Sequence, residues 1–417
     1  MTEINQLHII GLIPDHNYIP PEYTRLIRGA DILAGGDRLL DMFADFKGEK
    51  KPLSTPLKLW LQELEECRKQ GRKIVVLTSG DPNFYGLAKL LMREVPPEAV
   101  SILPSLTTVQ QAFAHLKVSW ERSEVVSLHG RGSLTVFWSA LYRASHYHGS
   151  GYVAIYTDAE NSPSHIAKRL LGRGQDNWRM HVFEDLGTHD EQVSTWALFD
   201  AKVRKFSPLN LVVLENIKRP APISLGMPEC AFVHEAGLIT KREVRATTLG
   251  MLELQPYHTL WDLGAGSGSV SIEAAALLPH GSIWAVEKSP LRTEQIAANR
   301  AFFGAAQVEI IEDEALAAMG HLPDPDRIFI GGGGANLAAL IKTAAGKLKP
   351  GGIIVANVVT LEALKQASST LESLGMEMSI TQLQASRSET LGGSLYLKPL
   401  NQVWLVRGTS ASEREEE

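Results

Sequence analysis

Three glycines at alternate positions are the first residues whose type and spacing indicate chemistry. Gly264, Gly266 and Gly268 lie in "DLGAGSG", after an apolar run typical of a strand and before the helix-like segment "SVSIEAAALL". Glycine lets the backbone turn tightly and approach a ligand closely, and a helix start offers unpaired amides. The spacing is GxGxG, whereas a dinucleotide fingerprint is GxGxxG. The turn therefore predicts a cofactor site but speaks against a nicotinamide dinucleotide.

Acidic residues accompany this turn and follow the next two predicted strands. Asp262 lies just ahead of the glycines, and Glu287 in "SIWAVEK" is placed where a carboxylate accepts hydrogen bonds from a ribose diol. Asp313, Glu314 and Ala315 in "VEIIEDEA" follow the third strand, where an adenine edge would lie. Glu287 alone also fits a solvated acid at a strand end. The combination of all three features favours cofactor binding.

Two further segments suit a large anionic substrate. Gly332 and Gly333 belong to the run "IFIGGGGANL", which offers amides and room for a bulky carbon nucleophile, although a flexible turn is the simpler alternative. Lys241, Arg242 and Arg245 in "GLITKREVRA" gather positive charge that can hold carboxylates. In the same segment Thr240 and Glu243 have the spacing of a capping box, which predicts a helix start.

These residues require two α/β series to position them. Short apolar runs alternate with amphipathic segments, which predicts βα units and, in the first half, a largely parallel sheet. Two helix starts are marked: Thr107 and Gln110 form a capping box, and Ser162 precedes a proline. The expected strands are Leu7–Ile10, Lys73–Thr78, Val100–Leu103, Val125–Leu128, Tyr152–Tyr156 and Leu209–Leu214, then Thr259–Asp262, Ser282–Val286, Val308–Ile311, Arg327–Ile330, Gly352–Asn357 and Gln402–Val406.

The proline-rich stretch "ENIKRPAPISLGMPEC" interrupts this periodicity and predicts a linker. We therefore expect a first domain over residues 1–215, a linker over 216–230, a second domain over 231–408 and an acidic tail over 409–417. The length of 417 residues agrees with two or three domains at about 150 residues each.

Composition excludes several other classes. The net charge of -6 argues against a general nucleic-acid binder. Cys67 and Cys230 form no CxxC pair, so neither a disulfide framework nor a metal site is expected. The sequence has no apolar run of the roughly 18 residues that span a bilayer, and its start does not have the pattern of a signal peptide. We expect a cytoplasmic protein without membrane or nucleic-acid partners.

The second half resembles the class I S-adenosylmethionine (SAM) methyltransferases, which have a Rossmann-like fold. "GLITKREVRA", "LWDLGAGSGSVSIEAA", "DRIFIGGGG" and "LKPGGIIVANVVTLE" are similar to the decarboxylating precorrin methyltransferases of cobalamin (vitamin B12) biosynthesis, which act at carbon 15. The resemblance implies that the cofactor is SAM and that its binding residues are Thr240, Gly264, Gly266, Gly268, Glu287, Glu314 and Ala315.

The first half resembles the tetrapyrrole methylase family, a two-lobed α/β fold that also binds SAM. "VVLTSGDPNFYG" and "ILPSLTTVQQAFAHL" carry this resemblance, which implies cofactor contacts from Asp81, Thr107 and Thr108. "VVSLHGRG" and "EDLGTHDE" are similar to the branch that methylates carbon 5. The first loop departs from the family, because Ile13 stands where a glycine is common. The ordinary alternatives are that Asp81 caps a turn and that His129 is a core histidine.

Both halves together resemble the family of fused precorrin-6B C(5),C(15)-methyltransferases. The resemblance implies a tetrapyrrole substrate, methylation at carbons 5 and 15 with loss of the ring C acetate carboxylate, precorrin-8X as product, one SAM site per domain and a homo-oligomer. No catalytic base stands out, and Arg131 and Arg387 join the basic candidates for substrate binding. The open alternatives are another tetrapyrrole substrate, a nicotinamide-dependent oxidoreductase and a non-catalytic SAM-binding protein.

Overall fold

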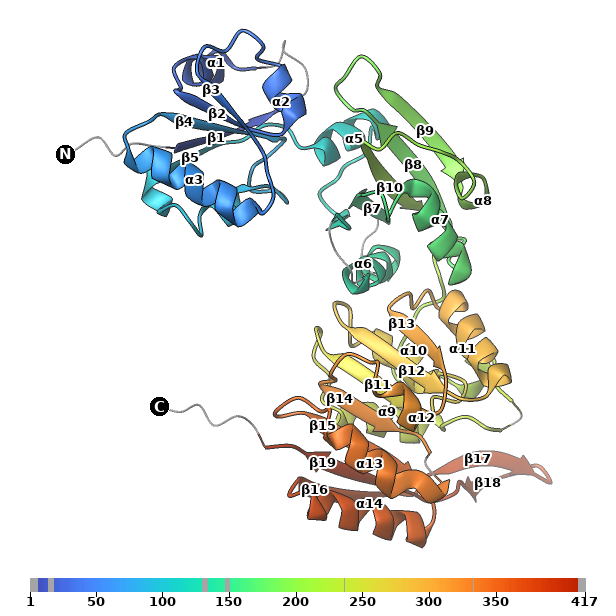
Figure 1. The fold of residues 1–417 in the computed structure, drawn as a ribbon. Coiled ribbons are helices and arrows are strands. Elements are labelled where there is room, and N and C mark those ends of the chain that lie inside the picture. The colour runs from blue at the N-terminus through green and yellow to red at the C-terminus, as the bar shows by residue number, and fades with distance from the viewer. Residues whose placement is uncertain are drawn as a thin grey trace.

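The protein folds into two α/β halves, the first of which is divided into two lobes (Figure 1). The computed structural model describes residues 7–13, 19–129, 134–146, 151–235, 237–332 and 334–411. Each lobe of the first half contains a five-stranded sheet, and the second half contains a seven-stranded sheet and a separate two-stranded ribbon.

The first lobe is a parallel sheet with helices on both faces, in the strand order β3-β2-β4-β1-β5. Neighbouring residues of β1 point to opposite faces, so Ile9 packs with Trp60 of α3 while Ile10 packs with Leu39 of α2. This double burial explains why β1 reads as a continuous apolar run. The elements are β1 (Leu7–Leu12), α1 (Pro21–Arg28), β2 (Ile32–Gly35), α2 (Asp37–Asp41), β3 (Glu49–Pro52), α3 (Leu57–Lys69), β4 (Ile74–Ser79), α4 (Ala88–Leu91), η2 (Pro97–Ala99) and β5 (Val100–Leu103).

The second lobe is a mixed sheet in the order β6-β7-β10-β8-β9. Only β6 and β7 pair in parallel, whereas β10 is antiparallel to β7 and β8, and β8 is antiparallel to β9. The expectation of a largely parallel sheet is therefore wrong for this lobe, because hairpin-like returns replace the βα units after β8. The elements are α5 (Thr108–Leu116), β6 (Glu124–Ser127), α6 (Thr135–His146), β7 (Tyr152–Tyr156), α7 (Pro163–Gly172), β8 (Trp178–Glu184), β9 (Gln192–Ala197), α8 (Leu198–Ala201) and β10 (Asn210–Asn216).

The second half is a seven-stranded sheet in the order β13-β12-β11-β14-β15-β19-β16. Strands β11 to β15 run parallel, and β19 is antiparallel to both of its neighbours. The elements are η3 (Glu229–Ala231), α9 (Arg242–Met251), β11 (Thr259–Leu263), α10 (Ser269–Ala275), β12 (Ser282–Glu287), α11 (Pro290–Phe302), β13 (Val308–Glu312), α12 (Ala315–Ala318), β14 (Arg327–Ile330), η4 (Gly334–Asn336), α13 (Leu337–Ala345), β15 (Ile353–Val358), α14 (Leu361–Ser373), β16 (Glu377–Leu383), β17 (Ser386–Leu391), β18 (Ser394–Pro399) and β19 (Val403–Thr409).

All three expected helix starts are found, but only two of the three predicted caps are confirmed. Thr107 and Gln110 form the capping box of α5, and the Ser162 hydroxyl accepts the amide of His165 at the start of α7. The N-cap of α9 is Lys241, one residue later than the predicted Thr240, and no side chain caps the helix. Thr240 therefore lies in the preceding loop.

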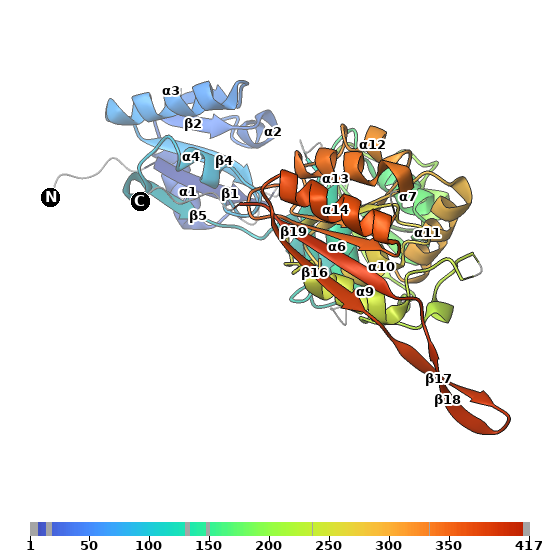
Figure 2. The same cartoon turned by 90° about the horizontal axis from the view of Figure 1, so that it is seen from below.

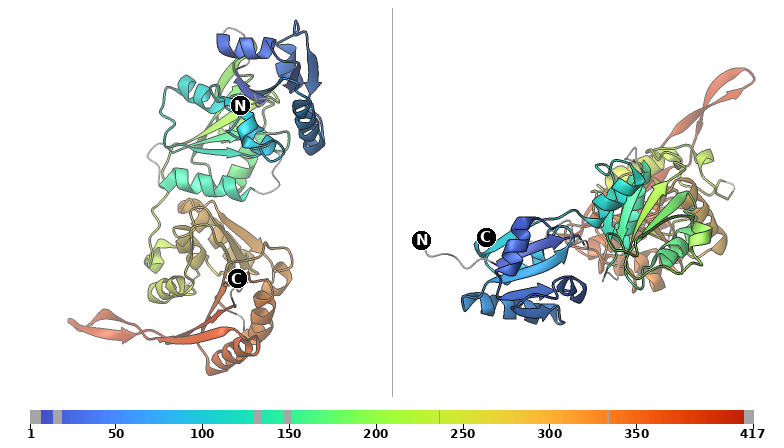
Figure 3. Two further views of the ribbon diagram at one scale, coloured as in Figure 1. Left: turned by 90° about the vertical axis from the view of Figure 1, so that its left-hand side faces the viewer. Right: turned by 90° about the horizontal axis from the view of Figure 1, so that it is seen from above.

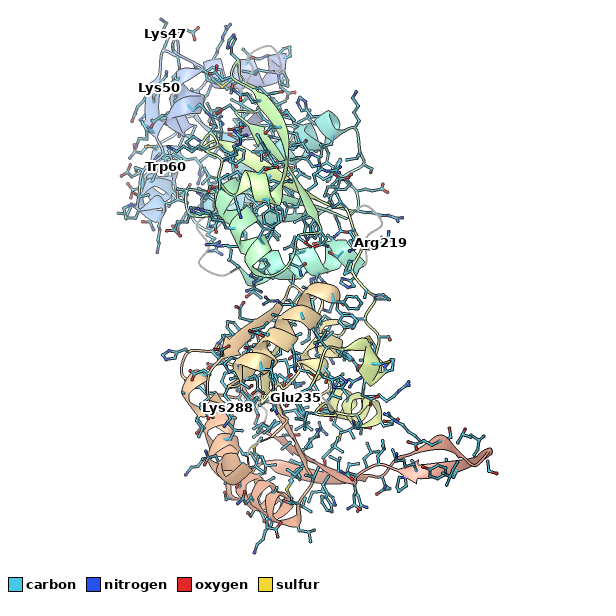
Figure 4. The ribbon with its side chains drawn as sticks, turned by 90° about the vertical axis from the view of Figure 1, so that its right-hand side faces the viewer. Lys47, Lys50, Trp60, Arg219, Glu235 and Lys288 are labelled. Carbon is cyan, nitrogen blue, oxygen red and sulfur yellow. The ribbon has the colours of Figure 1, made fainter. Side chains whose placement is uncertain are left out.

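The second lobe and the second half are in direct contact through α6 and α7 (Figure 1). The guanidinium of Arg143 donates to Glu124 within its own lobe and to the carbonyl of Pro279 across the junction at 2.9 Å. Arg173 forms an ion pair with Glu309. Figure 4 shows Arg219 at this junction, within the expected linker. Side-chain contacts thus hold the halves together in addition to the covalent connection.

The β17–β18 ribbon extends away from the rest of the second half (Figures 2 and 3). The two strands pair with each other, from Ser386 opposite Pro399 to Leu391 opposite Ser394. Leu391, Leu395 and Leu397 are each about three-quarters exposed, at 71, 78 and 70 %. No helix in the described ranges is long and apolar enough to cross a bilayer.

Candidate active sites

The larger of two candidate sites is a cavity of about 590 Å³ at the carboxyl ends of β11, β14 and β15. Gly264 and Gly266 line it from the glycine turn, and Gly331 and Asn357 line it from the next two strands. Its opposite wall comes from residues 237–241 and from the base of the β17–β18 ribbon, including Ala385. Ligands of open α/β sheets bind at this edge, where strand ends and helix starts face a common crevice.

The backbone geometry of the turn explains why these three positions are glycine. Gly264, Gly266 and Gly268 have φ of +76°, +60° and +76°, a region that disfavours other residues. A Cβ on Gly268 would lie 2.9 Å from the side chain of Ile296, so this glycine lets α11 pack closely. Apart from its chain neighbours, a Cβ on Gly266 would meet no atom of the described residues within 4 Å, so it would enter the cavity that Gly266 lines. Gly266 thus leaves space for a ligand, whereas Gly268 serves packing.

Glu287 is fixed beneath the turn. Its carboxylate accepts the amides of Gly266 at 2.9 Å and Ser289 at 3.1 Å, and the residue is 5 % exposed. The alternative of a solvated strand-end acid is therefore wrong. Each carboxylate oxygen retains a second lone pair, so the geometry is compatible with a further hydrogen bond from a ribose hydroxyl.

Asp262 is a fully buried acid next to the turn. Its Oδ2 accepts the Ser271 hydroxyl at 2.5 Å, and its Oδ1 has no hydrogen-bond partner among the described residues. Burial raises the pKa of Asp262 to about 7, the hydroxyl of Ser271 opposes the shift, and the nearby Glu287 carboxylate adds to it. The carboxyl group is thus largely protonated in mildly acid solution.

This protonation predicts a pH dependence of stability. Between the usual pKa of 3.8 and about 7 the folded state holds a proton on Asp262 that the unfolded state releases. The free energy of unfolding of the second half should therefore fall as pH rises through this window and become level above it. Urea unfolding of the chain and of Asp262→Asn at about pH 5 and about pH 8 measures the effect. A variant whose pH dependence equals that of the parent would contradict this assignment.

The remaining expected cofactor residues of the second half are spread around the same sheet edge. Thr240 lines the cavity. Glu314 is exposed and forms an ion pair with Lys288 at 3.1 Å, and Ala315 begins α12. The pairing of Glu287 with Glu312 places the ends of β12 and β13 side by side, so Glu314 and Ala315 lie two and three residues beyond this pair.

Of the expected substrate cations in "GLITKREVRA", only Lys241 lines the cavity. Its ammonium donates to the Gly237 carbonyl at 3.4 Å. Arg242 is exposed but does not line the cavity.

The expectation that Arg245 binds substrate is wrong. Arg245 and Glu273 are both 0 % exposed, and the guanidinium donates to Glu273 at 2.8 Å. Its other nitrogens donate to the carbonyls of Met227 and Thr240. The side chain is therefore committed to the interior, where it joins α9, α10 and the linker.

The expectation that Arg387 binds substrate is also wrong, because its guanidinium is already hydrogen-bonded to two carboxylates of the protein. Its guanidinium donates to Glu229 and Glu243 through four hydrogen bonds of 2.7 to 3.1 Å. Although burial opposes the shift, hydrogen bonds from Arg387 lower the pKa of Glu229 to about 2. Glu243 is thus an anchor and not a capping residue. This cluster ties the ribbon base, which walls the cavity, to η3 and α9.

The second candidate site is a cavity of about 200 Å³ between the lobes of the first half. The first lobe contributes Arg38 and Gly80, and the second contributes Thr108, Tyr156 and Asn210. Thr108 donates to the Tyr156 hydroxyl at 3.0 Å. Sequence reasoning missed Arg38 and Tyr156, because residues more than 100 positions apart meet only when the lobes close on each other.

Asp81 and Thr107 lie beside this cavity without lining it. Asp81 Oδ1 accepts the amide of Asn83 at 2.8 Å, so the alternative that Asp81 caps a turn is confirmed. Gly80 has a φ of +66°, and a Cβ on it would lie 3.2 Å from the Cα of Thr107. A Cβ on Gly11 would lie 1.8 Å from the carbonyl oxygen of Gly80. The backbone at Gly80 passes so close to Gly11 that only glycine fits there, near the end of β1.

Three further expectations concern loops. His129 is exposed, so its interpretation as a core histidine is wrong. Gly332 is exposed, and its carbonyl oxygen would lie 3.5 Å from a Cβ on Gly264, so the two glycine-rich turns face each other. Arg131 and Gly333 lie outside the described residues.

Comparison with known proteins agrees with the division of the chain into two halves. Residues 6–202 match the family of tetrapyrrole (corrin/porphyrin) methylases, and residues 230–408 match the precorrin methyltransferase domain. The precorrin-6Y C(5,15)-methyltransferase [decarboxylating] of a Sinorhizobium species is 33 % identical over 383 residues, 91 % of this chain and 90 % of its own.

Single-domain proteins are similar to part of the chain. A cobalt-precorrin-6B C(15)-methyltransferase (decarboxylating) of Salmonella typhimurium is 38 % identical over 43 % of this chain and 90 % of its own. A cobalt-precorrin-7 C(5)-methyltransferase of the same organism is 34 % identical over 50 % of this chain and 99 % of its own.

The two folds and these matches define a two-domain SAM-dependent methyltransferase. The near full-length similarity is more specific than this class. The chain belongs to the family of decarboxylating precorrin-6Y C(5,15)-methyltransferases. The alternatives of a nicotinamide-dependent oxidoreductase and of a non-catalytic SAM-binding protein are therefore dropped.

Proposed function

We propose that the chain methylates a precorrin at carbons 5 and 15 and removes the carboxylate of its ring C acetate group, giving precorrin-8X in cobalamin biosynthesis. One observation carries the proposal: a single chain is similar over nearly its whole length to a relative named for both methyl transfers. Separate relatives named for each transfer match about half of it. The closest alternative is the same chemistry on another tetrapyrrole.

The proposal divides the chain into the domains expected from the sequence. Residues 1–215 methylate carbon 5, residues 216–230 link the domains, and residues 231–408 methylate carbon 15 with decarboxylation. Residues 409–417 form the acidic tail. The matches to two unrelated family models on either side of the linker support this division.

The glycine turn of the second half fits the cofactor that its family uses. Gly264 and Gly266 would hold SAM against the backbone, with Glu287, Glu314, Ala315 and Thr240 around it. The open space beyond Gly266 supports this role. Gly268 would act indirectly, by letting α11 approach. Bound SAM supplies a methyl group already activated on a sulfonium. The protein has to align a carbon nucleophile with that methyl group and exclude water.

In the first half, Asp81, Thr107 and Thr108 would contact a second SAM. Thr108 lines the interlobe cavity, whereas Asp81 and Thr107 shape the turn beside it. One SAM site in each domain is therefore part of the proposal.

The substrate carboxylates need cations near the pockets. Lys241 lines the larger cavity and forms no ion pair within the described ranges, so it is the best supported of the basic candidates. Gly332 would leave room for the macrocycle beside the glycine turn. Gly333, which lies outside the described residues, stays a proposed contact. Arg242 and Arg131 remain proposed contacts.

We also infer a homo-oligomer. A two-stranded ribbon standing alone is only marginally stable in water, and the β17–β18 ribbon exposes three leucines in addition. A second copy of the chain that covers this ribbon would bury these side chains.

Mass analysis of the products tests the proposed function. The full chain, purified precursor and SAM should give a product with two methyl groups gained and one carbon dioxide lost. Each separately expressed half should deliver one methyl group, and carbon dioxide should be lost only with the second half. A product without loss of carbon dioxide would contradict the proposal.

The proposed role of Asp81 predicts a selective defect. Asp81→Ala removes the carboxylate that orders the turn at the interlobe cavity and should impair methylation at carbon 5 only. Methylation at carbon 15 in the same reaction is the internal control. A variant that delivers both methyl groups at the normal rate would refute the assignment.

A further inference from the structure

The interlobe cavity of the first half is lined by one charged side chain among its described residues, that of Arg38. Arg38 belongs to α2, a short helix that packs on the first-lobe sheet through Leu39 and Leu40. Because those neighbours are buried in the core, the helix is fixed in place. The guanidinium is therefore presented to the cavity from a rigid support.

The rest of the lining is polar or apolar but uncharged. Leu12, Leu186 and Leu211 form apolar parts of the wall, and Phe183 adds an aromatic face. An arginine beside such a surface suits a ligand that is largely apolar but carries a carboxylate at its edge.

The hydrogen-bonding capacity of Arg38 is mostly unused. Nη2 donates to the Ser79 hydroxyl at 3.1 Å, which is the one hydrogen bond of this side chain among the described residues. A guanidinium has five N–H donors in a fixed plane, so the others are available to a ligand. The bond to Ser79, at the end of β4, also orients the plane beside Gly80.

The charge of Arg38 is only weakly compensated. Burial lowers the pKa of Arg38, and the carboxylate of Asp185 acts in the opposite direction. Neither Asp185 nor another carboxylate forms an ion pair with it in the described part of the chain. Arg387 in the second half, by contrast, is bound by two carboxylates. An arginine left with spare donors at a cavity is in a position to recruit an anion.

We propose that Arg38 binds a carboxylate of a ligand held between the two lobes, as a specificity residue for methylation at carbon 5. The inference rests on the proposed function, because both reactants of that transfer carry carboxylates. The precorrin carries several, and SAM carries one on its amino-acid part. The planar guanidinium can donate two parallel hydrogen bonds to the two oxygens of a carboxylate of the precorrin or of SAM. Kinetic experiments distinguish these two ligands.

The test uses the full chain with Arg38→Gln and measures methylation at carbon 5 by mass analysis. The KM for SAM and the KM for the precorrin are determined separately. We expect one of them to rise about tenfold or more, as the loss of a charged hydrogen bond implies. A rise in the KM for SAM assigns the carboxylate to the cofactor, and a rise in the KM for the precorrin assigns it to the substrate.

Matched variants make the result specific. Arg38→Lys keeps the charge but not the fork, so its KM should lie between those of the parent and of Arg38→Gln. Arg25→Gln removes an exposed arginine of the same lobe and should leave both constants within about twofold, as is usual for surface changes. Methylation at carbon 15 reports that the variant chain is folded.

Two results would overturn the inference. Both constants could stay unchanged in Arg38→Gln while carbon 5 is still methylated, or kcat alone could fall. Failure of the proposed function is a separate result, because the unmodified chain would then not methylate carbon 5.

Discussion

Replacing Gly266 by leucine is expected to abolish methylation at carbon 15 and the accompanying loss of carbon dioxide. The new side chain would enter the cavity, because apart from the chain neighbours of Gly266 no atom of the described residues lies within 4 Å of the added Cβ. A ligand displaced by about 1 Å can lose about 100-fold in rate, and leucine blocks far more space than that. Methylation at carbon 5 should continue, since it depends on the other half.

Mass analysis measures the loss of methylation at carbon 15, and calorimetric titration measures SAM binding by the same variant. The binding stoichiometry should fall from two sites to one. Gly266 has a φ of +60°, so any side chain also adds backbone strain of about 1 to 2 kcal/mol. Gly375→Leu is the matched control, because Gly375 has a φ of +68°, open space around its Cβ and no part in the cavity. Full SAM stoichiometry in Gly266→Leu would count against the site.

Replacing Arg245 by methionine is expected to destabilise the second half by about 3 to 5 kcal/mol. The change leaves the Glu273 carboxylate buried without its cation and removes donors from the carbonyls of Met227 and Thr240. Glu273 keeps the amides of Gly226 and Met227, each at 2.8 Å, which offset part of the loss. The linker and α9 should loosen together, because Arg245 joins them.

Urea unfolding followed by hydrogen exchange of second-half peptides measures this destabilisation. Arg242→Met is the control on the same helix, where an exposed arginine should cost no more than about 0.5 kcal/mol. The experiment also separates a structural role from substrate binding. A stable Arg245→Met chain with a raised KM for the precorrin would restore the sequence-based expectation and contradict the structural one.

Local signals in the sequence were sufficient for much of the fold. The capping box at Thr107 is confirmed because its donors and acceptors lie within four residues of each other. The GxGxG turn between β11 and α10 is likewise a local feature, since left-handed backbone demands glycine where it occurs. Most strands of the parallel sheets were found because burial on both faces produces continuous apolar runs, but β2 and β3 were not among the expected strands.

Other elements escaped prediction because their residues are ordinary. Strands β16, β17 and β18 are mostly exposed, and only β18 has adjacent apolar side chains, at Leu395, Tyr396 and Leu397. Strand β9 is also largely exposed, and its partner β8 includes charged and polar residues. Such strands are defined by their partners, and pairing partners are not visible in a local window.

The basic residues show most clearly what cannot be predicted from the sequence. From the sequence alone Lys241, Arg245 and Arg387 are equivalent cations near a cofactor turn. Tertiary structure separates them by where the carboxylates lie: Glu273 neutralises Arg245 in the core, and Glu229 and Glu243 neutralise Arg387. Arg38 gained its importance in the same way, by facing a lobe that begins some seventy residues later.

The sequence by itself determined the class of chemistry, the two families and the glycine turn at which we propose that a cofactor binds. These depend on short motifs, whose backbone geometry is dictated by neighbouring residues. Only the tertiary structure decided which charges remain available to a ligand and which serve the core. The reason is physical: the free energy of a charge depends on its distance from opposite charges and from water, and both distances are set by segments far apart in the chain.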